Sequence, residues 1–255
     1  MKIMTFNLRF ENDRDGQNSW SNRKDLVTDV IRKYAPSILG TQEGTQRQLS
    51  YLRDSLSDYE ISSPDRLFDE TCQYPTLFYR PDKLKVISCG EFWLSKTPRE
   101  HRSKDWDSAF PRMMSYSLFQ DLELSKTFWA VVTHLDNIGK DARRQQARII
   151  AEWVERKVEP VVLMGDFNTI PESQVHDILC SPRTSLRDTW QELGGTEGKE
   201  SMTHHGFQGI PQKGRLDWIL VSEQFHVRET TIVRDRSGES YPSDHYPYIA
   251  EIEWS

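Results

Sequence analysis

The chain has 255 residues, a length that fits one large domain better than two small ones. Its 33 Lys and Arg residues against 39 Asp and Glu residues give a net charge of −6, which argues against tight, sequence-independent binding to duplex DNA, because that binding relies on clustered basic side chains. No apolar run approaches the roughly 18 residues of a membrane-spanning helix, so no membrane association is expected.

The first predicted element is a strand at the start of the chain. Residues 2–9 alternate apolar and polar side chains, the pattern of a half-buried strand, and this would deliver Asn7 and Arg9 to one side. A strand that begins at Lys2 leaves no room for a signal peptide. The three cysteines are well separated and have no metal-ligand spacing. A reduced, cytoplasmic setting is therefore expected.

A helix and a buried strand are predicted next. Apolar residues at helical spacing predict a helix over residues 21–34, with Ser21 as its N-cap and Pro36 as its stop. Residues 37–43 then form an apolar run that ends in the carboxylate of Glu43.

A second helix is predicted over residues 45–56, before a long stretch of short strands. Alternating runs separated by turns over residues 59–122 indicate several antiparallel strands. Within this stretch, residues 96–112 mix basic and aromatic side chains that suit phosphates and a ring, so Arg112 and Trp106 are candidate substrate contacts. A charged surface loop would have the same composition, and that alternative stays open.

A strand, a helix and a second strand are predicted in the middle of the chain. The apolar run at residues 128–134 ends in the imidazole of His134, and a long helix is predicted over residues 140–157. The buried strand that follows ends in Gly-Asp-Phe-Asn, which puts Asp166 and Asn168 on the same side of its tip. A carboxylate beside a carboxamide can deprotonate and orient a water molecule. The same four residues also suit an ordinary turn.

Strands dominate the C-terminal part, after a short predicted helix over residues 171–179. The apolar run from residue 216 to 221 contains Asp217, and a buried lone carboxylate is costly unless it has a partner. Asp244 and His245 follow in a loop. Any one of these polar residues could simply be solvated at a strand end, but their number indicates a common site.

This ordered set of motifs resembles the endonuclease/exonuclease/phosphatase superfamily, which includes deoxyribonuclease I, exonuclease III-type enzymes and inositol polyphosphate phosphatases. The matching motifs span nearly the whole chain and lie at residues 5–9, 41–43, 133–135, 165–168, 215–219 and 243–245. Further stretches resemble a branch of small bacterial metal-dependent hydrolases. Strands that pair first with helices and later with each other indicate an α/β class. The resemblance implies one catalytic domain over residues 1–255, a four-layer αββα sandwich of two mixed β-sheets packed face to face with helices outside.

The resemblance also implies a metal site. Glu43 is the leading candidate ligand, because a hard carboxylate oxygen suits Mg²⁺. Asn7 and Asp244 are expected to support it, directly or through water. Mn²⁺ is the alternative ion.

The catalytic roles are implied in the same way. Asp166 would orient and deprotonate the attacking water, with Asn168 holding the geometry. His245 would stabilise charge on the phosphate oxygens while Asp217 fixes its tautomer, and His134 would bind a non-bridging oxygen.

Two more residues are candidate substrate contacts. Arg9 follows Asn7 by two positions and would reach the same cleft. A zinc site at the adjacent His204 and His205 is not indicated, because their side chains should point apart and no cysteine or carboxylate cluster accompanies them. In the small-hydrolase branch a His-Gly-Phe element precedes the Arg-Leu-Asp strand, so His205 resembles a substrate-pocket residue.

The predicted function is a Mg²⁺-dependent phosphoesterase that uses in-line water attack on a small phosphorylated compound or a short single-stranded nucleic acid. A DNA or RNA nuclease is the alternative among enzymes. A binding protein that kept the fold without catalysis is the alternative of another class. The natural substrate and the choice between monoester and diester stay open, and no required protein partner is evident.

Overall fold

Two six-stranded β-sheets form the centre of the computed structural model, which describes residues 1–63 and 65–255. The first sheet has the strand order β11-β12-β1-β2-β4-β3. β1 pairs in parallel with β2 and antiparallel with β12, so this sheet is mixed and joins the two ends of the chain. Its strands are β1 (Lys2–Asn7), β2 (Ile38–Gly44), β3 (Glu60–Ile61), β4 (Tyr74–Tyr79), β11 (Phe225–Ile232) and β12 (Tyr248–Trp254).

The second sheet comes from the middle of the chain and has the strand order β5-β6-β7-β8-β10-β9. β7 and β8 are parallel and are connected through helix α3 (Lys140–Glu155), whereas β10 runs antiparallel to β8. This sheet is therefore mixed as well. Its strands are β5 (Leu84–Trp93), β6 (Met113–Asp121), β7 (Thr127–His134), β8 (Val161–Asp166), β9 (Leu186–Asp188) and β10 (Asp217–Ser222).

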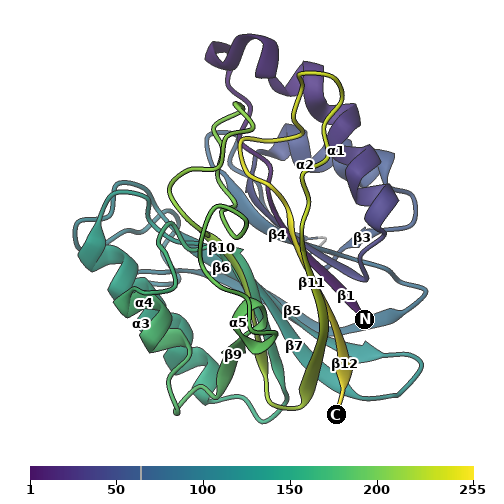
Figure 1. Cartoon of the computed structure of the whole chain (residues 1–255). Helices are drawn as coiled ribbons and strands as arrows, with labels where there is room; N and C mark the ends of the chain where they lie inside the picture. Colours follow the sequence, from purple (N-terminus) through teal and green to yellow (C-terminus); the bar gives the residue numbers. More distant parts are fainter. Residues whose placement is uncertain (64) are drawn as a thin grey trace.

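Helices cover the outer face of each sheet (Figure 1). The apolar residues of α1 (Trp20–Tyr34) and α2 (Gln46–Ser55) pack on the first sheet, and those of α3 and α4 (Gln174–Leu179) pack on the second. Two short helices, η1 (Asp13–Asn18) and α5 (Thr189–Glu192), complete the described elements. None of the described helices is long and apolar enough to cross a membrane.

The inner faces of the two sheets pack directly on each other. Ile3 from the first sheet and Phe128 and Val162 from the second belong to one fully buried apolar cluster. The sheets approach so closely at Gly40 that a Cβ there would lie 2.5 Å from the sulfur of Met164. The predicted four-layer sandwich of two mixed sheets is confirmed.

The predicted helices are present, but some of their ends differ from the prediction. α2 begins as predicted, since Thr45 and Gln48 form a reciprocal capping box at its N-terminus. The prediction of Ser21 as N-cap of the first helix is wrong. That helix begins after Ser19, because the buried Trp20 already belongs to its first turn. The third and fourth helices lie within their predicted ranges but are shorter.

Gly165 lies where β7 and β8 come closest. A Cβ at this position would lie 2.1 Å from the backbone oxygen of Thr133, its partner in the parallel ladder. Gly165→Ala is expected to lower the free energy of unfolding by about 1–3 kcal/mol in urea denaturation. A Cβ at Gly198 would meet nothing within 4 Å. The control Gly198→Ala should therefore change the free energy of unfolding by less than about 1 kcal/mol. Equal midpoints for the two variants would contradict this packing.

Candidate active site

The polar motifs meet at one rim of the two sheets. In the first sheet Asn7 ends β1, and Glu43 lies at the same edge because β1 and β2 are parallel. In the second sheet His134 and Asp166 are direct partners at the ends of the parallel strands β7 and β8. Asp217 opens the antiparallel strand β10 directly opposite Asp166. Strand pairing therefore brings together residues that are far apart in the sequence.

Asn7 connects the two sheets at this rim. Its carboxamide nitrogen donates to Asp166 Oδ2 at 2.9 Å and to Glu43 Oε1 at 3.3 Å. Its oxygen accepts a hydrogen bond from the backbone N–H of Arg9 at 2.9 Å. Since an amide oxygen has two lone pairs, one of them stays free, and the side chain can support a metal ion directly or through water. It also holds two carboxylates in register.

Asp166 is a buried carboxylate with the properties of a general base. Its Oδ1 accepts from the backbone N–H of Asn168 at 2.8 Å. Burial, helped by the negative charge of Asp217, raises the pKa of Asp166 to about 7, against the opposing effects of His245 and the hydrogen bonds from Asn168 and Asn7. A base with a pKa near neutral is well matched to proton transfer at neutral pH.

His245 and Asp217 form a buried ion pair beside this base. Nδ1 of His245 lies 2.8 Å from Asp217 Oδ2, and its Nε2 lies 3.8 Å from Asp166 Oδ2. Burial lowers the pKa of His245, but the carboxylates of Asp217 and Asp166 outweigh it and raise that pKa to about 10. The ring is therefore an imidazolium. Among the described residues the other oxygen of Asp217 has no hydrogen-bond partner, so His245 is the partner that its buried charge requires.

His134 is neutral, in contrast to His245. Its Nδ1 lies 3.0 Å from NH1 of Arg112, and because a guanidinium can only donate, Nδ1 is the acceptor. Burial, with the positive charges of Arg112 and His245, holds the pKa of His134 well below its usual value. Its Nε2 faces Asp166 Oδ2 at 3.4 Å. The carboxamide nitrogen of Asn168 lies 2.8 Å from the same ring nitrogen. It donates a hydrogen bond to the backbone oxygen of Leu135.

Three residues of the site hold left-handed backbone conformations at or just beyond strand ends. The φ values are 52° for Arg9, 61° for Glu43 and 51° for Asn168. Asparagine adopts this conformation more readily than arginine or glutamate does. Strained backbone of this kind persists where the surrounding structure enforces it, and it concentrates at functional sites.

Glu43 and Asp244 supply carboxylate oxygens to the same cavity. Oε2 of Glu43 accepts from the backbone N–H of Phe10 at 2.9 Å. Burial raises the pKa of Asp244, but the neighbouring His245 and Arg9 outweigh it and leave that pKa below its usual value, so the group is ionised. These two carboxylates fit a hard divalent cation. His204 lies close enough to Asp244 and His245 for a shared ion, but a protonated His245 cannot act as a ligand.

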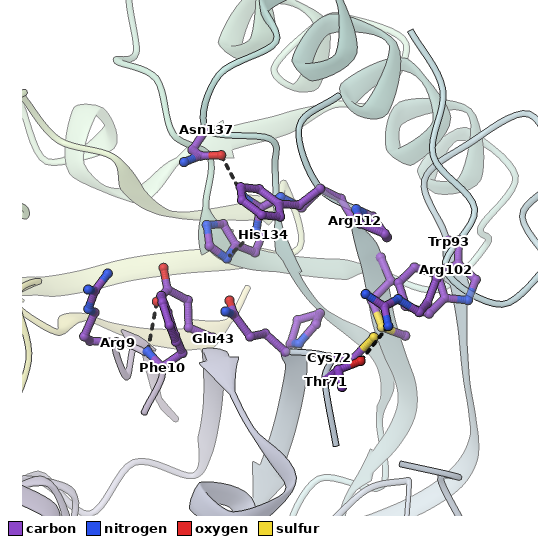
Figure 2. Close-up of a pocket in the computed structure, with 15 residues that line it drawn as sticks. Arg9, Phe10, Glu43, Thr71, Cys72, Trp93, Arg102, Arg112, His134 and Asn137 are labelled. Atoms are coloured by element: carbon purple, nitrogen blue, oxygen red, sulfur yellow. Dashed lines mark hydrogen bonds between the residues drawn. The ribbon is translucent and has the colours of Figure 1, made fainter. Parts of the chain in front are cut away.

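The site opens into a cleft with two parts that share lining residues, and Figure 2 shows one of them, the side pocket. The catalytic cavity, of about 440 Å³, is lined by Asp166, Asn168, His204, Asp244 and His245 among others. The side pocket, of about 250 Å³, is lined by Thr71, Cys72, Trp93, Arg102 and Phe110 among others. Both parts share the side chains of Arg9, Glu43, Arg112, His134 and Asn137.

Of the four predicted substrate contacts, two line the cleft. Arg9 forms a bidentate pair with Asp15 at 2.9 Å, and Arg112 contacts Asn137 at 3.3 Å beside His134.

The other two substrate predictions, His205 and Trp106, are wrong as to position. His205 is fully buried and stacks on Tyr246 with ring centroids 4.0 Å apart, because the turn directs its neighbour His204 to the cavity instead. Trp106 sits beside Lys96 and lines neither part of the cleft. The aromatic side chains that line the side pocket include those of Phe10, Trp93 and Phe110.

Sequence reasoning missed several polar residues of the cleft, among them Asn137, His204 and Lys213. Asn137 lies three residues after His134, where β7 ends. A polar residue just beyond a strand end is the signal that could have identified it. His204 belongs to a pair of histidines that the pattern alone cannot orient. Lys213 donates to His204 Nε2 at 3.3 Å from a Gly-rich turn that carries no recognisable motif.

Comparisons with known proteins identify the family of this chain. The model of the Endonuclease/Exonuclease/phosphatase family matches residues 4–245. A solved structure of a Bacteroides vulgatus endonuclease/exonuclease/phosphatase is 31% identical, with a TM-score of 0.89 over 100% of this chain and 98% of the other. A Bacteroides thetaiotaomicron mannosyl-6-phosphatase is 27% identical, with a TM-score of 0.87 over 100% of both chains. An uncharacterized protein of Acanthamoeba polyphaga mimivirus is 26% identical over 66% of this chain and 67% of its own. The chain therefore belongs to the endonuclease/exonuclease/phosphatase family and is a phosphoester hydrolase.

Proposed function

We propose that the protein is a Mg²⁺-dependent phosphatase that releases phosphate from small phosphorylated compounds. The observation that carries the proposal is the side pocket, whose volume of about 250 Å³ opens beside the catalytic residues. This is slightly below the roughly 300–1,000 Å³ of pockets that hold drug-sized ligands, so it suits a single ring or a short carbon chain. The similarity to a mannosyl-6-phosphatase over the full length of both chains supports a leaving group of this size.

The phosphate would bind in the catalytic cavity. Arg112 and the imidazolium of His245 present positive charge there, and Asn168 lines the same cavity. These groups are fixed by their own partners before substrate arrives, since Arg112 contacts His134 and Asn137 and His245 contacts Asp217. Preorganised charge of this kind stabilises the charge that develops in the transition state.

The water nucleophile would be activated by Asp166. This carboxylate lines the catalytic cavity but not the side pocket. Water held at Asp166 would therefore attack phosphorus from one side while the leaving group departs toward the side pocket, as in-line displacement requires. The proton of the water passes to an oxygen of Asp166, and His245 balances the charge beside it.

Glu43 and Asp244 would hold Mg²⁺, with Asn7 in support. The bound ion would supply charge stabilisation at the phosphate oxygens. The chain's own contribution is to aim both carboxylates into one cavity, Glu43 through hydrogen bonds from Phe10 N–H and Asn7, and to keep Asp244 ionised through its cationic surroundings.

A substrate panel tests this proposal. An aryl phosphomonoester, mannose 6-phosphate, an aryl phosphodiester, single-stranded DNA and RNA, and duplex DNA would be assayed with Mg²⁺ or EDTA. Turnover of the monoesters that EDTA abolishes and Mg²⁺ restores is expected. Preferred cleavage of single-stranded nucleic acid would instead identify a nuclease. Metal-dependent thermal stabilisation without turnover of any ester would indicate a binding protein.

Glu43→Ala is expected to raise the Mg²⁺ concentration for half-maximal activity at least about tenfold, because even residues that only support metal ligands cost 10–100-fold in affinity. A Mg²⁺ titration of monoester hydrolysis measures this shift. The exposed Glu172 provides the control Glu172→Ala, which should keep the wild-type titration curve. A wild-type curve for Glu43→Ala would remove Glu43 from the metal site.

A further inference from the structure

We propose that the side pocket selects leaving groups that carry a second anionic group, and that Arg102 binds this group. The inference rests on the proposed function and specifies its substrate class. Figure 2 shows Arg9 and Arg102 on opposite sides of the pocket, with Glu43 and His134 between them. A substrate whose phosphate lies at Glu43 and His134 would therefore extend its far end toward Arg102.

The charges around the side pocket favour an anion at that far end. Its lining side chains include three guanidinium groups, those of Arg9, Arg102 and Arg112, and the carboxylate of Glu43. Arg9 is neutralised by its bidentate pair with Asp15, and Arg112 belongs to the phosphate end. Glu43 would be engaged by the metal. Arg102 also contacts a carboxylate, that of Asp69, but only through NH1, so it is the cation at this end of the pocket with donors left for the leaving group.

The guanidinium of Arg102 is positioned but not saturated. Its NH1 donates to Thr71 Oγ1 at 2.6 Å and contacts Asp69 Oδ2 at 3.2 Å. Among the described residues, Nε and NH2 of Arg102 have no hydrogen-bond partner, and the side chain is 42% exposed. A guanidinium fork with free donors binds carboxylate or phosphate oxygens in a bidentate manner.

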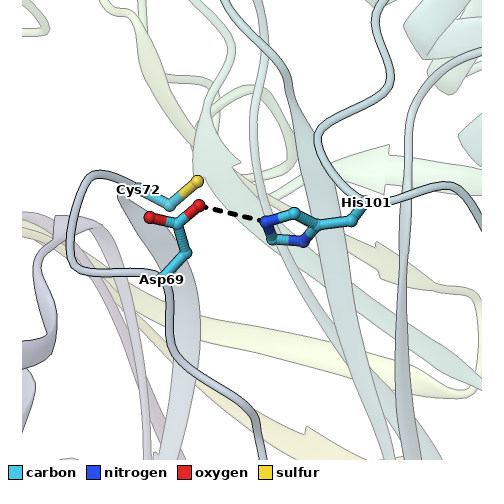
Figure 3. A group of neighbouring side chains, drawn as sticks. All are labelled: Asp69, Cys72 and His101. Atoms are coloured by element: carbon cyan, nitrogen blue, oxygen red, sulfur yellow. Dashed lines mark hydrogen bonds and ion pairs between the residues drawn. The ribbon is translucent and has the colours of Figure 1, made fainter.

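Asp69 fixes the position of this arginine through the contact with NH1. Figure 3 shows Asp69 between Cys72 and His101, with a 3.0 Å contact from its Oδ2 to His101 Nε2. These three side chains have the spacing of a cation site. However, Arg102 already occupies the same Asp69 oxygen, and burial raises the pKa of the Cys72 thiol, which keeps it protonated. The cluster therefore holds the side chain of Arg102 in position.

Apolar side chains separate the two charged ends. Trp93, Phe110 and Met113 line the pocket, together with two prolines. Trp93 is held in place by an edge-to-face contact with His101, at a centroid distance of 5.6 Å. An apolar middle with cationic groups at each end matches a short carbon skeleton that carries two anions.

Three substrates with a 6-phosphate test the inference: glucose 6-phosphate, 6-phosphogluconate and glucose 1,6-bisphosphate. The second adds a carboxylate and the third a second phosphate. The wild-type enzyme should show higher kcat/KM for at least one of the two doubly anionic substrates, mainly through a lower KM. Whichever is preferred identifies the source of the second anion.

Arg102→Gln should reduce that preference by about tenfold to a hundredfold, the usual effect of a lost charged hydrogen bond. Arg102→Lys should retain part of it. Arg99 lies in the same loop, is exposed and does not line the side pocket, so Arg99→Gln is the control and should keep the wild-type preference. Thermal unfolding of each variant checks that the loop is intact.

Two failures of this experiment are distinguishable. Turnover of all three substrates without a preference, or an unchanged preference in Arg102→Gln, would overturn the inference and leave the proposed function standing. Absence of turnover on every monoester would overturn the proposed function and this inference with it.

Discussion

Asp166→Asn is expected to reduce turnover by roughly 10²–10⁴, the scale of a lost general base, while the protein stays folded. The amide has nearly the same size, and its oxygen can still accept the hydrogen bond from Asn168 N–H that now reaches Asp166 Oδ1. It cannot accept a proton from water. The measurement is kcat with Mg²⁺ on the best monoester of the panel, alongside thermal unfolding of the same preparation.

Asp177→Asn is the matched control for this variant. Asp177 is exposed on α4 and lies outside both parts of the cleft, so its amide variant should retain wild-type turnover. A kcat for Asp166→Asn that stays close to the wild-type value would remove Asp166 from the mechanism. Loss of activity together with loss of the cooperative thermal transition would show that the variant failed to fold.

The ends of the strands could be predicted from the sequence more readily than the pairing of the strands. Strand-end polar residues such as His134 and Asp166 can be recognised locally, because a buried apolar run must end where polar side chains begin. Their meeting depends on the parallel pairing of β7 with β8, which only the family resemblance implied. The division of residues 59–122 between two sheets could not be predicted, because nothing local in the sequence of β4 or β6 shows that the two strands join different sheets.

The errors within the site have a similar origin. His204 and His205 are adjacent and chemically identical, so the sequence cannot say which one faces substrate. The choice depends on distant partners: His205 stacks on Tyr246, while the backbone of His204 bridges to Gln212 and His245. Such tertiary contacts leave no local periodicity.

Asp136 was not predicted at all, and it organises the loops that carry the cleft residues. Its side chain is fully buried, and its two oxygens accept five hydrogen bonds between them. Oδ1 bonds the backbone at the start of α3, and Oδ2 bonds the loop that leads to Arg112. The donors are Ile138 N, Gly139 N, Ser108 Oγ, Ala109 N and Phe110 N.

Asp136→Ala is therefore expected to lower the free energy of unfolding by about 3–5 kcal/mol, because it leaves buried donors and the nearby Arg112 without their partner. At roughly 2–4 °C per kcal/mol, Tm should fall by about 6–20 °C. Asp141→Ala is the control: this residue is 42% exposed and pairs with Arg144 on the surface, so its loss should cost less than about 1 kcal/mol.

The pH dependence of the same variant provides a second check. Burial raises the pKa of Asp136, but the hydrogen bonds from the backbone of Gly139, Phe110 and Ile138 outweigh it and hold that pKa below its usual value. A carboxyl group with a lowered native pKa stabilises the fold above its unfolded pKa of about 3.9 and loses that contribution as pH falls through the native pKa. The stability gap between the wild type and Asp136→Ala should thus be full at neutral pH and shrink below about pH 4. A gap that is constant down to the acid transition would mean that the lost energy comes from packing and not from the ionised carboxylate.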